Sequence, residues 1–235
     1  MKRYLTFLFC FFAAFLSFSQ SDIKREFLEM LEHSKAQFKS EEYTIIFRQN
    51  TYVYDRQKPY ESFVQQFSRK GSSYAHKAPE FEILNLPEYR IVVDSTDKII
   101  YITDTEAYQE PVNFFVKEEF LEKVRIEKKV SGNSVVYNVD VFSLNMEFEA
   151  IQYYFNKESN VLQKIIFFYK EGEYYEDENH LNEKESPVQE IIIEKITFGK
   201  TGFPLKEKYI SVTKNSFSVA AGYKGFELND VRQKK

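Results

Sequence analysis

The sequence predicts a mainly β protein in which a single large, curved antiparallel sheet carries helices on one face. Three observations favour this class. Most of the chain after residue 40 consists of short runs rich in Tyr, Phe, Val, Ile and Thr that partly alternate with polar residues, as strands do. Short polar loops join these runs, so neighbouring strands should pair antiparallel. Apolar residues recur at helical spacing in two segments only.

Residues 1–19 have the layout of a secretory signal peptide. Lys2 and Arg3 precede an apolar run over residues 4–16, and small residues occupy the first and third positions of a cleavage site before Gln20. This run is short for a permanent membrane anchor, which is the alternative interpretation. Lipid attachment at Cys10 is disfavoured because bulky Phe9 precedes it. We therefore expect a secreted mature chain of residues 20–235.

The composition of residues 20–235 excludes several classes of protein. Removing Lys2 and Arg3 leaves 30 basic and 36 acidic residues, a formal net charge of −6, and no cysteine remains. Disulfides, a catalytic thiol and thiolate metal ligands are therefore excluded from the mature chain. The acidic balance, without a cluster of Lys and Arg, argues against nucleic acid as a partner. No linker rich in Pro, Gly or Ser divides the chain, which favours one domain.

Two segments are predicted to be helical. Residues 21–38 place an apolar side chain at three- and four-residue steps, with Asp22 as the expected N-cap and one face formed by Ile23, Phe27, Met30, Leu31 and Phe38. A shorter helix is expected within residues 110–128, capped near Asn113, with Phe120, Leu121 and Val124 facing inward.

About nine to eleven strands are predicted in the rest of the chain. Residues 88–104 are expected to be a hairpin, because the Asx and Ser side chains of residues 94–97 can bond their own backbone. Residues 146–169 are expected to be a second hairpin that turns at residues 156–160. Lys70-Gly71-Ser72 predicts a turn between two further strands. Alternation predicts shared faces for Tyr43, Ile45 and Phe47, for Phe63 and Phe67, for Tyr89, Ile91 and Val93, and for Val135, Tyr137, Val139 and Val141.

Several strands are apolar on both faces, which raises the question of what covers them. Residues 165–169 are Ile-Ile-Phe-Phe-Tyr. Residues 99–102, 153–155 and 191–193 are likewise apolar or aromatic at every position. An antiparallel sheet normally leaves one face polar, and large exposed apolar patches are rare in soluble monomers. Two helices cannot cover all of this surface. A closed barrel filled by its own rings, a bound apolar ligand and a partner protein all remain possible covers.

The order of these elements resembles a known family. A secreted chain with an N-terminal amphipathic helix, an "IVVDSTDKIIYI" hairpin, a short helix, a "YYFNKESNVLQKIIFF" hairpin and a late "EIIIEKITF" strand is similar to the periplasmic lipoprotein carriers of LolA/LolB-like fold. The resemblance covers residues 21–198. The acidic segment of residues 171–185 and the chain after Phe203, which ends in basic residues, depart from the family pattern.

The resemblance implies a half-barrel with a helical lid and a periplasmic, non-enzymatic function. The protein is expected to bind a lipid, an acyl chain or a lipoprotein in an apolar concavity, without a cofactor. The residues predicted to line it are Phe47, Phe63, Phe67, Ile91, Val93, Tyr137, Val139 and Phe167. The alternative is an interaction module of a cell-envelope assembly, in which another envelope protein covers the sheet.

No catalytic or metal-binding motif is present in the sequence. His33, His76 and His180 are far apart and lack metal-ligand spacing, and no G-x-S-x-G or glycine-rich phosphate motif occurs. Residues 171–185 hold seven acids, but they lack the ligand spacing and turn glycine of a calcium loop and are expected to form a solvated loop. Tyrosine pairs such as Tyr153-Tyr154 fit either strand propensity or a binding platform.

Overall fold

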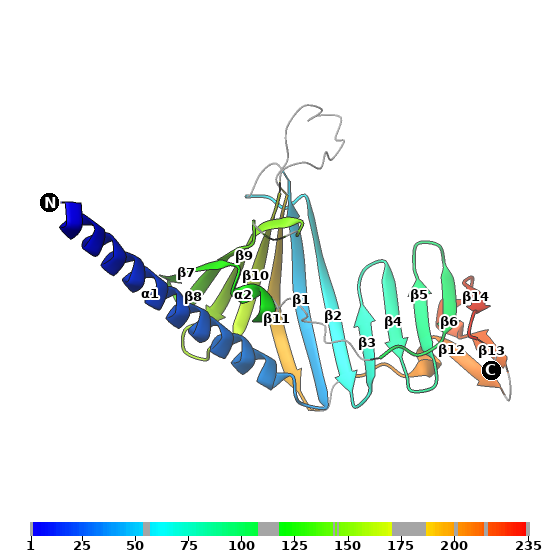
Figure 1. Ribbon diagram of the computed structural model, residues 1–235. Helices are drawn as coiled ribbons and strands as arrows, with labels where there is room; N and C mark the ends of the chain where they lie inside the picture. The colour runs from blue at the N-terminus through cyan, green and yellow to red at the C-terminus, as the bar shows by residue number, and fades with distance from the viewer. Residues whose placement is uncertain are drawn as a thin grey trace. The chain divides into compact units, whose positions relative to one another are not determined.

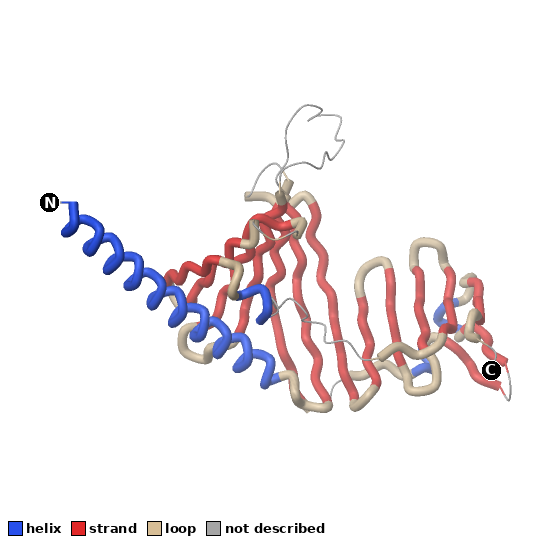
Figure 2. The backbone as a smooth tube through the Cα atoms, in the orientation of Figure 1, coloured by secondary structure: helices blue, strands red, loops and turns tan. Residues whose placement is uncertain are grey.

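The computed structural model describes residues 2–53, 57–107, 118–142, 144, 146–170, 187–199, 202–213 and 216–233, with side chains from residue 20 onward except those of 118 and 119. Strands form most of this backbone (Figures 1 and 2). The helices are α1 (Lys2–Gln37), α2 (Glu118–Leu121) and the 3-10 turns η1 (Lys206–Lys208) and η2 (Ala221–Tyr223).

The described residues form fourteen strands, more than the nine to eleven that were predicted, and one of them begins at Arg125, where a helix was expected. They are β1 (Glu42–Tyr52), β2 (Glu61–Lys70), β3 (Ser73–Lys77), β4 (Phe81–Asn85), β5 (Arg90–Asp94), β6 (Ile99–Thr103), β7 (Arg125–Ser131), β8 (Ser134–Asp140), β9 (Phe148–Asn156), β10 (Leu162–Tyr169), β11 (Val188–Phe198), β12 (Ile210–Thr213), β13 (Ser216–Val219) and β14 (Glu227–Asp230).

Twelve strands are hydrogen-bonded in the order β14-β6-β5-β4-β3-β2-β1-β11-β10-β9-β8-β7, and β12 and β13 form a separate pair. The sheet is therefore open, with β14 and β7 as its edge strands among the described residues. The hairpin pairs are antiparallel as predicted, but β14 pairs with β6 in parallel. This exception arises because the chain passes through β12, β13 and η2 before it returns to the sheet edge.

The chain divides into two compact units. The first unit contains Met1–Gln37, Asn50–Glu61 and Phe114–Ile192, and the second contains Phe38–Gln49, Ser62–Asn113 and Ile193–Lys235. The expectation of one domain over residues 20–235 stays a prediction. No helix in the part of the chain that the structure describes is both long and apolar enough to cross a membrane.

The predicted turn chemistry is confirmed at the first hairpin, and the second hairpin uses the same kind of bond. The Asp94 carboxylate accepts hydrogen bonds from the backbone N–H groups of Thr96 and Asp97, each at 2.9 Å. Asn156 Oδ1 accepts the N–H groups of Glu158 and Ser159 at the same distance. Backbone N–H groups in a turn commonly lack a backbone acceptor, and here the Asx side chain accepts their hydrogen bonds instead. Asx residues therefore stabilise the loop between two strands.

The apolar face of α1 forms the core of the first unit, where the helix packs along the strands (Figure 1). Phe27 is fully buried, and its ring centroid lies 5.2 Å from that of Tyr137 and 5.1 Å from that of Tyr153. Leu31 and Met30 are buried beside it. Asp22 is not the N-cap, because α1 begins at Lys2 and the Asp22 carboxylate instead accepts a hydrogen bond from Arg25.

Polar side chains of α1 tie the helix to strand backbone. Gln20 Nε2 donates to the carbonyl of Ile126 at 2.9 Å, and Gln20 Oε1 accepts the N–H of the same residue at 3.2 Å. Ile126 lies in the edge strand β7, so this amide satisfies two backbone groups that no further strand pairs. Buried Ser34 accepts the N–H of Leu162 at 3.1 Å in β10.

Replacing Gln20 with Ala should lower the free energy of unfolding by about 1 kcal/mol, because the substitution leaves two part-buried backbone groups without their partner. Chemical denaturation of purified protein measures the change. Gln163→Ala is the control, since Gln163 is exposed in β10. Equal effects of the two substitutions would show that the Gln20 contact does not stabilise the fold.

The predicted second helix ends earlier than expected. Residues 110–117 lie outside the described residues, α2 spans Glu118–Leu121, and the chain enters β7 at Arg125, so residues 125–128 of the predicted segment are strand. The residues that follow Leu121 explain this, since Val124 and Ile126 alternate with polar neighbours and are buried at strand spacing. Leu121 and Val124 are buried as predicted, Phe120 is half-buried, and Asn113 lies outside the described residues.

Candidate functional site

The second unit presents one line of side chains across neighbouring strands of the sheet. The line contains one residue from each strand from β2 through β6, and each residue is the direct register partner of the next. The five residues are Phe67, His76, Ile83, Val92 and Tyr101. We call this set the apolar row. Phe67 is buried, whereas the other four are half-buried and keep part of their surface exposed. The row is thus a continuous apolar strip on a sheet face that retains accessible surface.

The opposite face of the same strands is closed. The neighbouring register line consists of Ser68, Ala75, Leu84, Ile91 and Ile102, and all five are buried. A C-terminal segment, residues 203–230, packs against it and contributes Phe203, Tyr209, Ile210, Phe217, Val219, Tyr223, Phe226 and Leu228 to this core. We call this the tail-covered face. One face of these strands is therefore filled by the protein's own side chains, and the other is not.

His76 lies among aromatic rings in the apolar row. Its ring centroid is 5.1 Å from that of Phe81 in an edge-on contact and 6.4 Å from that of Phe47. His76 Nε2 and Gln65 Oε1 are 2.7 Å apart, and Gln65 Nε2 donates to Gln49 Oε1 at 3.0 Å. Burial lowers the pKa of His76, so the ring is neutral at pH 7 and compatible with an apolar neighbour.

A second register line runs parallel to the apolar row on the same face, two residues further along each strand. Its members are Arg69, Tyr74, Asn85, Arg90 and Thr103. We call it the polar row. Two residues along a strand correspond to about 7 Å, so polar groups follow the apolar row at a nearly constant distance.

Asn85 and Arg90 organise the centre of the polar row. The Asn85 side chain is buried, donates to the carbonyl of Glu106 at 3.0 Å and accepts the N–H of that residue at 3.0 Å. This arrangement fixes the backbone of Glu106, whose carboxylate pairs with Nη1 of Arg90. Nε of Arg90 is buried and has no hydrogen-bond partner among the described residues. The guanidinium therefore keeps one unused donor beside the apolar row.

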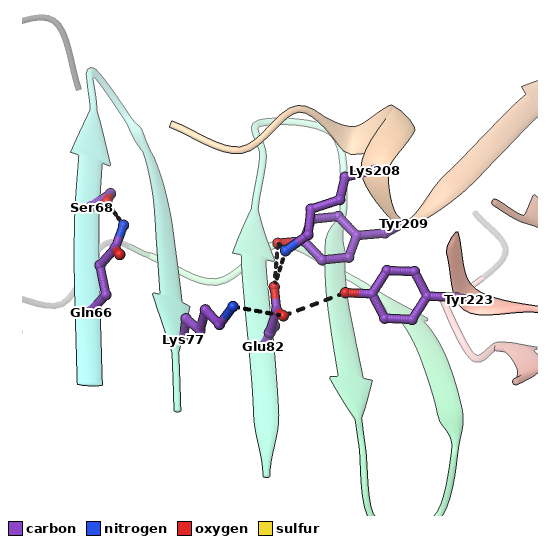
Figure 3. Close-up of polar contacts among 7 residues, drawn as sticks. All are labelled: Gln66, Ser68, Lys77, Glu82, Lys208, Tyr209 and Tyr223. Carbon is purple, nitrogen blue, oxygen red and sulfur yellow. Dashed lines mark hydrogen bonds and ion pairs between the residues drawn. The ribbon is translucent and has the colours of Figure 1, made fainter. Parts of the chain in front are cut away.

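A carboxylate on the tail-covered face holds the C-terminal segment in place (Figure 3). Glu82 accepts a hydrogen bond from the Tyr209 hydroxyl at 2.8 Å and one from Tyr223 at 3.4 Å, and it pairs with Lys208 and with Lys77. Burial alone would raise the pKa of Glu82, but hydrogen bonds from Lys208 and Tyr209 and the charges of the two lysines outweigh it and leave the pKa below its usual value. Burial and the Glu82 charge raise the pKa of Tyr223 to about 12.

Glu82→Gln should lower the free energy of unfolding at pH 7 by about 1–3 kcal/mol, because charge-assisted hydrogen bonds become neutral ones. The folded-state pKa of Glu82 lies below its usual value of 4.5, so ionised Glu82 stabilises the fold above that pH. This contribution is lost as the pH falls through the folded value. Denaturation of both proteins at pH 7 and at pH 3 should give a difference that shrinks at pH 3. An equal difference at the two pH values would contradict this role.

The structure distributes the eight predicted lining residues over different surfaces. Phe47, Phe63 and Phe67 lie on the face of the apolar row. Ile91 and Val93 are fully buried on the tail-covered face. Tyr137, Val139 and Phe167 lie in the first unit on the strand faces that carry the core beneath α1. Only the first group belongs to a surface with accessible area, and the site below is built on it.

Sequence reasoning missed His76, Ile83, Val92 and Tyr101. His76 has no motif spacing in the sequence that points to a site, and it lies within β3. In residues 89–94, Ile91 and Val93 were preferred over Val92 because they form the more apolar face. The more apolar face is the one that the protein covers itself, and the less apolar face remains accessible. Arg90, Val92 and Asp94 share the other face, and this combination of one apolar and two charged residues is the sequence feature that could have indicated the accessible face.

The polar groups on the helix-free face of the first unit bond to one another. Glu190 accepts from Asn50 at 3.0 Å, Lys164 at 2.9 Å and Tyr52 at 3.1 Å. Burial would raise the pKa of Glu190, but these donors lower it below its usual value. Lys164 also lies over the Tyr154 ring, 4.3 Å from its centroid. This network is satisfied and leaves no unpaired group to attract a ligand.

No metal site is formed by the side chains that the structure describes, since no three His, Cys, Asp or Glu residues lie close enough together. His33 is exposed on α1. His180 and the acidic segment of residues 171–185 lie outside the described residues.

Comparison with solved structures found similar chains at low sequence identity. A LolA superfamily protein from Nitrosomonas europaea matches 76% of this chain and 97% of its own, at 10% identity and a TM-score of 0.33. A domain described as an outer membrane lipoprotein-sorting protein from Vibrio parahaemolyticus matches 77% of this chain and 94% of its own, at 11% identity and a TM-score of 0.28.

A third similar structure is a DUF1329 family protein from Desulfovibrio piger, which matches 81% of this chain and 96% of its own at 6% identity and a TM-score of 0.33. No protein-family model and no curated protein matches the sequence. At these identities and TM-scores, no ligand, partner or residue role of the LolA-like proteins is transferred to this chain.

Proposed function

We propose that this protein is a secreted periplasmic carrier or binding protein that holds an acyl chain of a lipid or lipoprotein along the apolar row. The supporting observation is the difference between the two faces of β2 to β6. Ile91 and Ile102 are fully buried beneath the C-terminal segment, while Val92 and Tyr101, their neighbours in sequence, keep accessible surface. A soluble protein rarely leaves a connected apolar strip uncovered without a use for it.

The length of the apolar row fits one acyl chain. From Phe67 to Tyr101 the row crosses from β2 to β6 with each strand paired to the next. Four steps between strands of about 4.8 Å give a strip of about 19 Å. A membrane lipid chain spans about half of a hydrocarbon core that is about 30 Å thick, or about 15 Å. An extended chain therefore lies within the row.

The expected affinity is moderate. A fully buried methylene contributes about 0.8 kcal/mol, and a chain lying on one sheet face loses roughly half of its contact with water. Fourteen methylenes would then contribute about 6 kcal/mol, which corresponds to a dissociation constant between millimolar and micromolar. Reversible binding of this strength suits a carrier that accepts and releases cargo.

α1 is not proposed to act as a movable lid. Phe27, Met30 and Leu31 are buried in the core of the first unit, and each contributes about 1.5–3 kcal/mol relative to an exposed position. Undocking the helix would cost the sum of these contributions and the hydrogen bonds of Gln20 and Ser34. A helix held in this way is a structural element of its unit.

The proposal is tested with purified residues 20–235. Organic extraction followed by mass spectrometry should find co-purified lipid, and titration with a fluorescent fatty acid should give saturable binding. Absence of both would contradict the carrier function. Capture of a cell-envelope protein by a chain that binds no lipid would instead support the alternative of an interaction module.

A further inference from the structure

We infer that the preferred ligand is an anionic single-chain amphiphile, with its acidic head bound at Arg90 and its chain along the apolar row. The inference rests on the proposed function and names the chemical class of its ligand. It starts from the relation between the two register lines, because Arg90 and Val92 lie two residues apart on the same face of β5. A head group at Arg90 is thus about 7 Å from the apolar row.

The geometry gives the chain a direction and a length. From Val92 the apolar row continues through Ile83 and His76 to Phe67, one strand at a time. Three strand spacings are about 14 Å, close to the roughly 15 Å of a membrane acyl chain. Neutral His76 does not interrupt this path with a charge. An amphiphile with its head at β5 therefore reaches β2 with its chain end.

Arg90 has the properties of an anion-binding residue that is only partly used. Its side chain is 18% exposed, one nitrogen pairs with Glu106, and Nε is buried and has no acceptor in the described part of the chain. A buried donor without a partner is unfavourable, and a guanidinium binds a carboxylate best through two parallel N–H groups. A ligand carboxylate that displaces Glu106 would accept hydrogen bonds from the same guanidinium, which an alcohol does less well and a cation not at all.

Glu106 acts as the internal competitor of the ligand head. Its carboxylate pairs with Arg90 while its side chain is 55% exposed, so it can turn towards water without leaving a buried charge. Its backbone stays in place, because Asn85 holds both the N–H and the carbonyl. Removing the Glu106 charge should therefore strengthen the binding of an anionic ligand.

Titration calorimetry with laurate, lauryl alcohol and lauryl trimethylammonium compares three heads on one chain length. Laurate should bind at least about tenfold more tightly than the other two. Arg90→Gln should remove this preference and leave binding of the alcohol unchanged. Glu106→Gln should increase laurate affinity by about threefold or more. The control is Arg48→Gln, because Arg48 is ion-paired with Glu194 in the same unit.

The outcomes separate the two proposals. Equal binding of laurate and the alcohol by the unmodified protein, or a laurate preference that survives Arg90→Gln, would overturn the head-group inference while the carrier function stands. Failure of all three compounds to bind would contradict the carrier function and this inference with it. Should Arg90→Gln not fold, as judged by thermal unfolding, the head-group comparison and Glu106→Gln decide the question.

Discussion

Phe27→Ala is expected to lower the free energy of unfolding by about 3–5 kcal/mol, the range found when a fully buried Phe is truncated. Phe27 has no exposed surface, and its ring contacts those of Tyr137, Tyr153 and Phe155. Alanine would leave a cavity between α1 and the strands that these large rings cannot close. Urea or guanidinium denaturation, with circular dichroism as the signal, measures the loss.

Phe142→Ala is the matched control for Phe27→Ala. Phe142 belongs to the same unit, but it is 65% exposed, and the Lys170 ammonium lies over its ring. Its truncation should change the free energy of unfolding by about 0.5 kcal/mol or less. A small loss for Phe27→Ala, similar to that of the control, would show that α1 is loosely attached and would restore a mobile-lid role for the helix.

Val92→Glu is expected to weaken acyl-chain binding at least about thirtyfold, which corresponds to roughly 2 kcal/mol. Val92 is the fourth of the five members of the apolar row and the register partner of Ile83, and it is half-buried in the ligand-free protein. A carboxylate there is hydrated without ligand, but a bound chain would cover it and remove its water. Fluorescent fatty-acid titration measures the affinity, and thermal unfolding verifies that the variant is folded.

The control for Val92→Glu is Val212→Glu. Val212 is 49% exposed in β12 of the same unit and is not part of the apolar row. This variant should bind the fatty acid as the unmodified protein does. Equal weakening by both substitutions would point to a general effect of added negative charge on a fatty acid. No weakening by Val92→Glu would remove the apolar row from the binding site.

The local elements of this fold were predictable from the sequence because local chemistry determines them. Asp94 and Asn156 fix their hairpins through bonds to their own backbone, and the helical spacing of Phe27 and Leu31 identifies the buried face of α1. Alternation also identified the buried faces of β1 and β8. Each of these features is decided within about ten residues of chain.

The candidate site could not be predicted in the same way, because it depends on contacts between distant segments. The row from Phe67 to Tyr101 exists only when each strand pairs in one particular register. Whether Ile91 or Val92 is accessible is decided by residues 203–230, more than a hundred positions later in the chain. Local hydrophobicity predicts Ile91 as the residue that lines the site, but the C-terminal segment buries Ile91 and leaves Val92 accessible.

The double-sided apolar strands also have an explanation that combines local and distant effects. In β10, Ile165 and Phe167 are buried on the face that carries the core of the first unit, while Ile166 and Phe168 are half-buried on the other face. In β6, Ile100 and Ile102 face the C-terminal segment, and Tyr101 belongs to the apolar row. A helix in one unit and the chain's own tail in the other provide cover that the sequence pattern alone did not assign.

Methyl-resolved NMR of residues 20–235 with a nitroxide-labelled fatty acid tests the central claim most directly. Binding along the apolar row predicts that the label broadens the methyl signals of Ile83 and Val92 more strongly than those of Ile91 and Val93, which flank Val92 in the sequence and lie on the tail-covered face. Broadening centred on Ile91 and Val93, or no selective broadening in saturating fatty acid, would contradict the account.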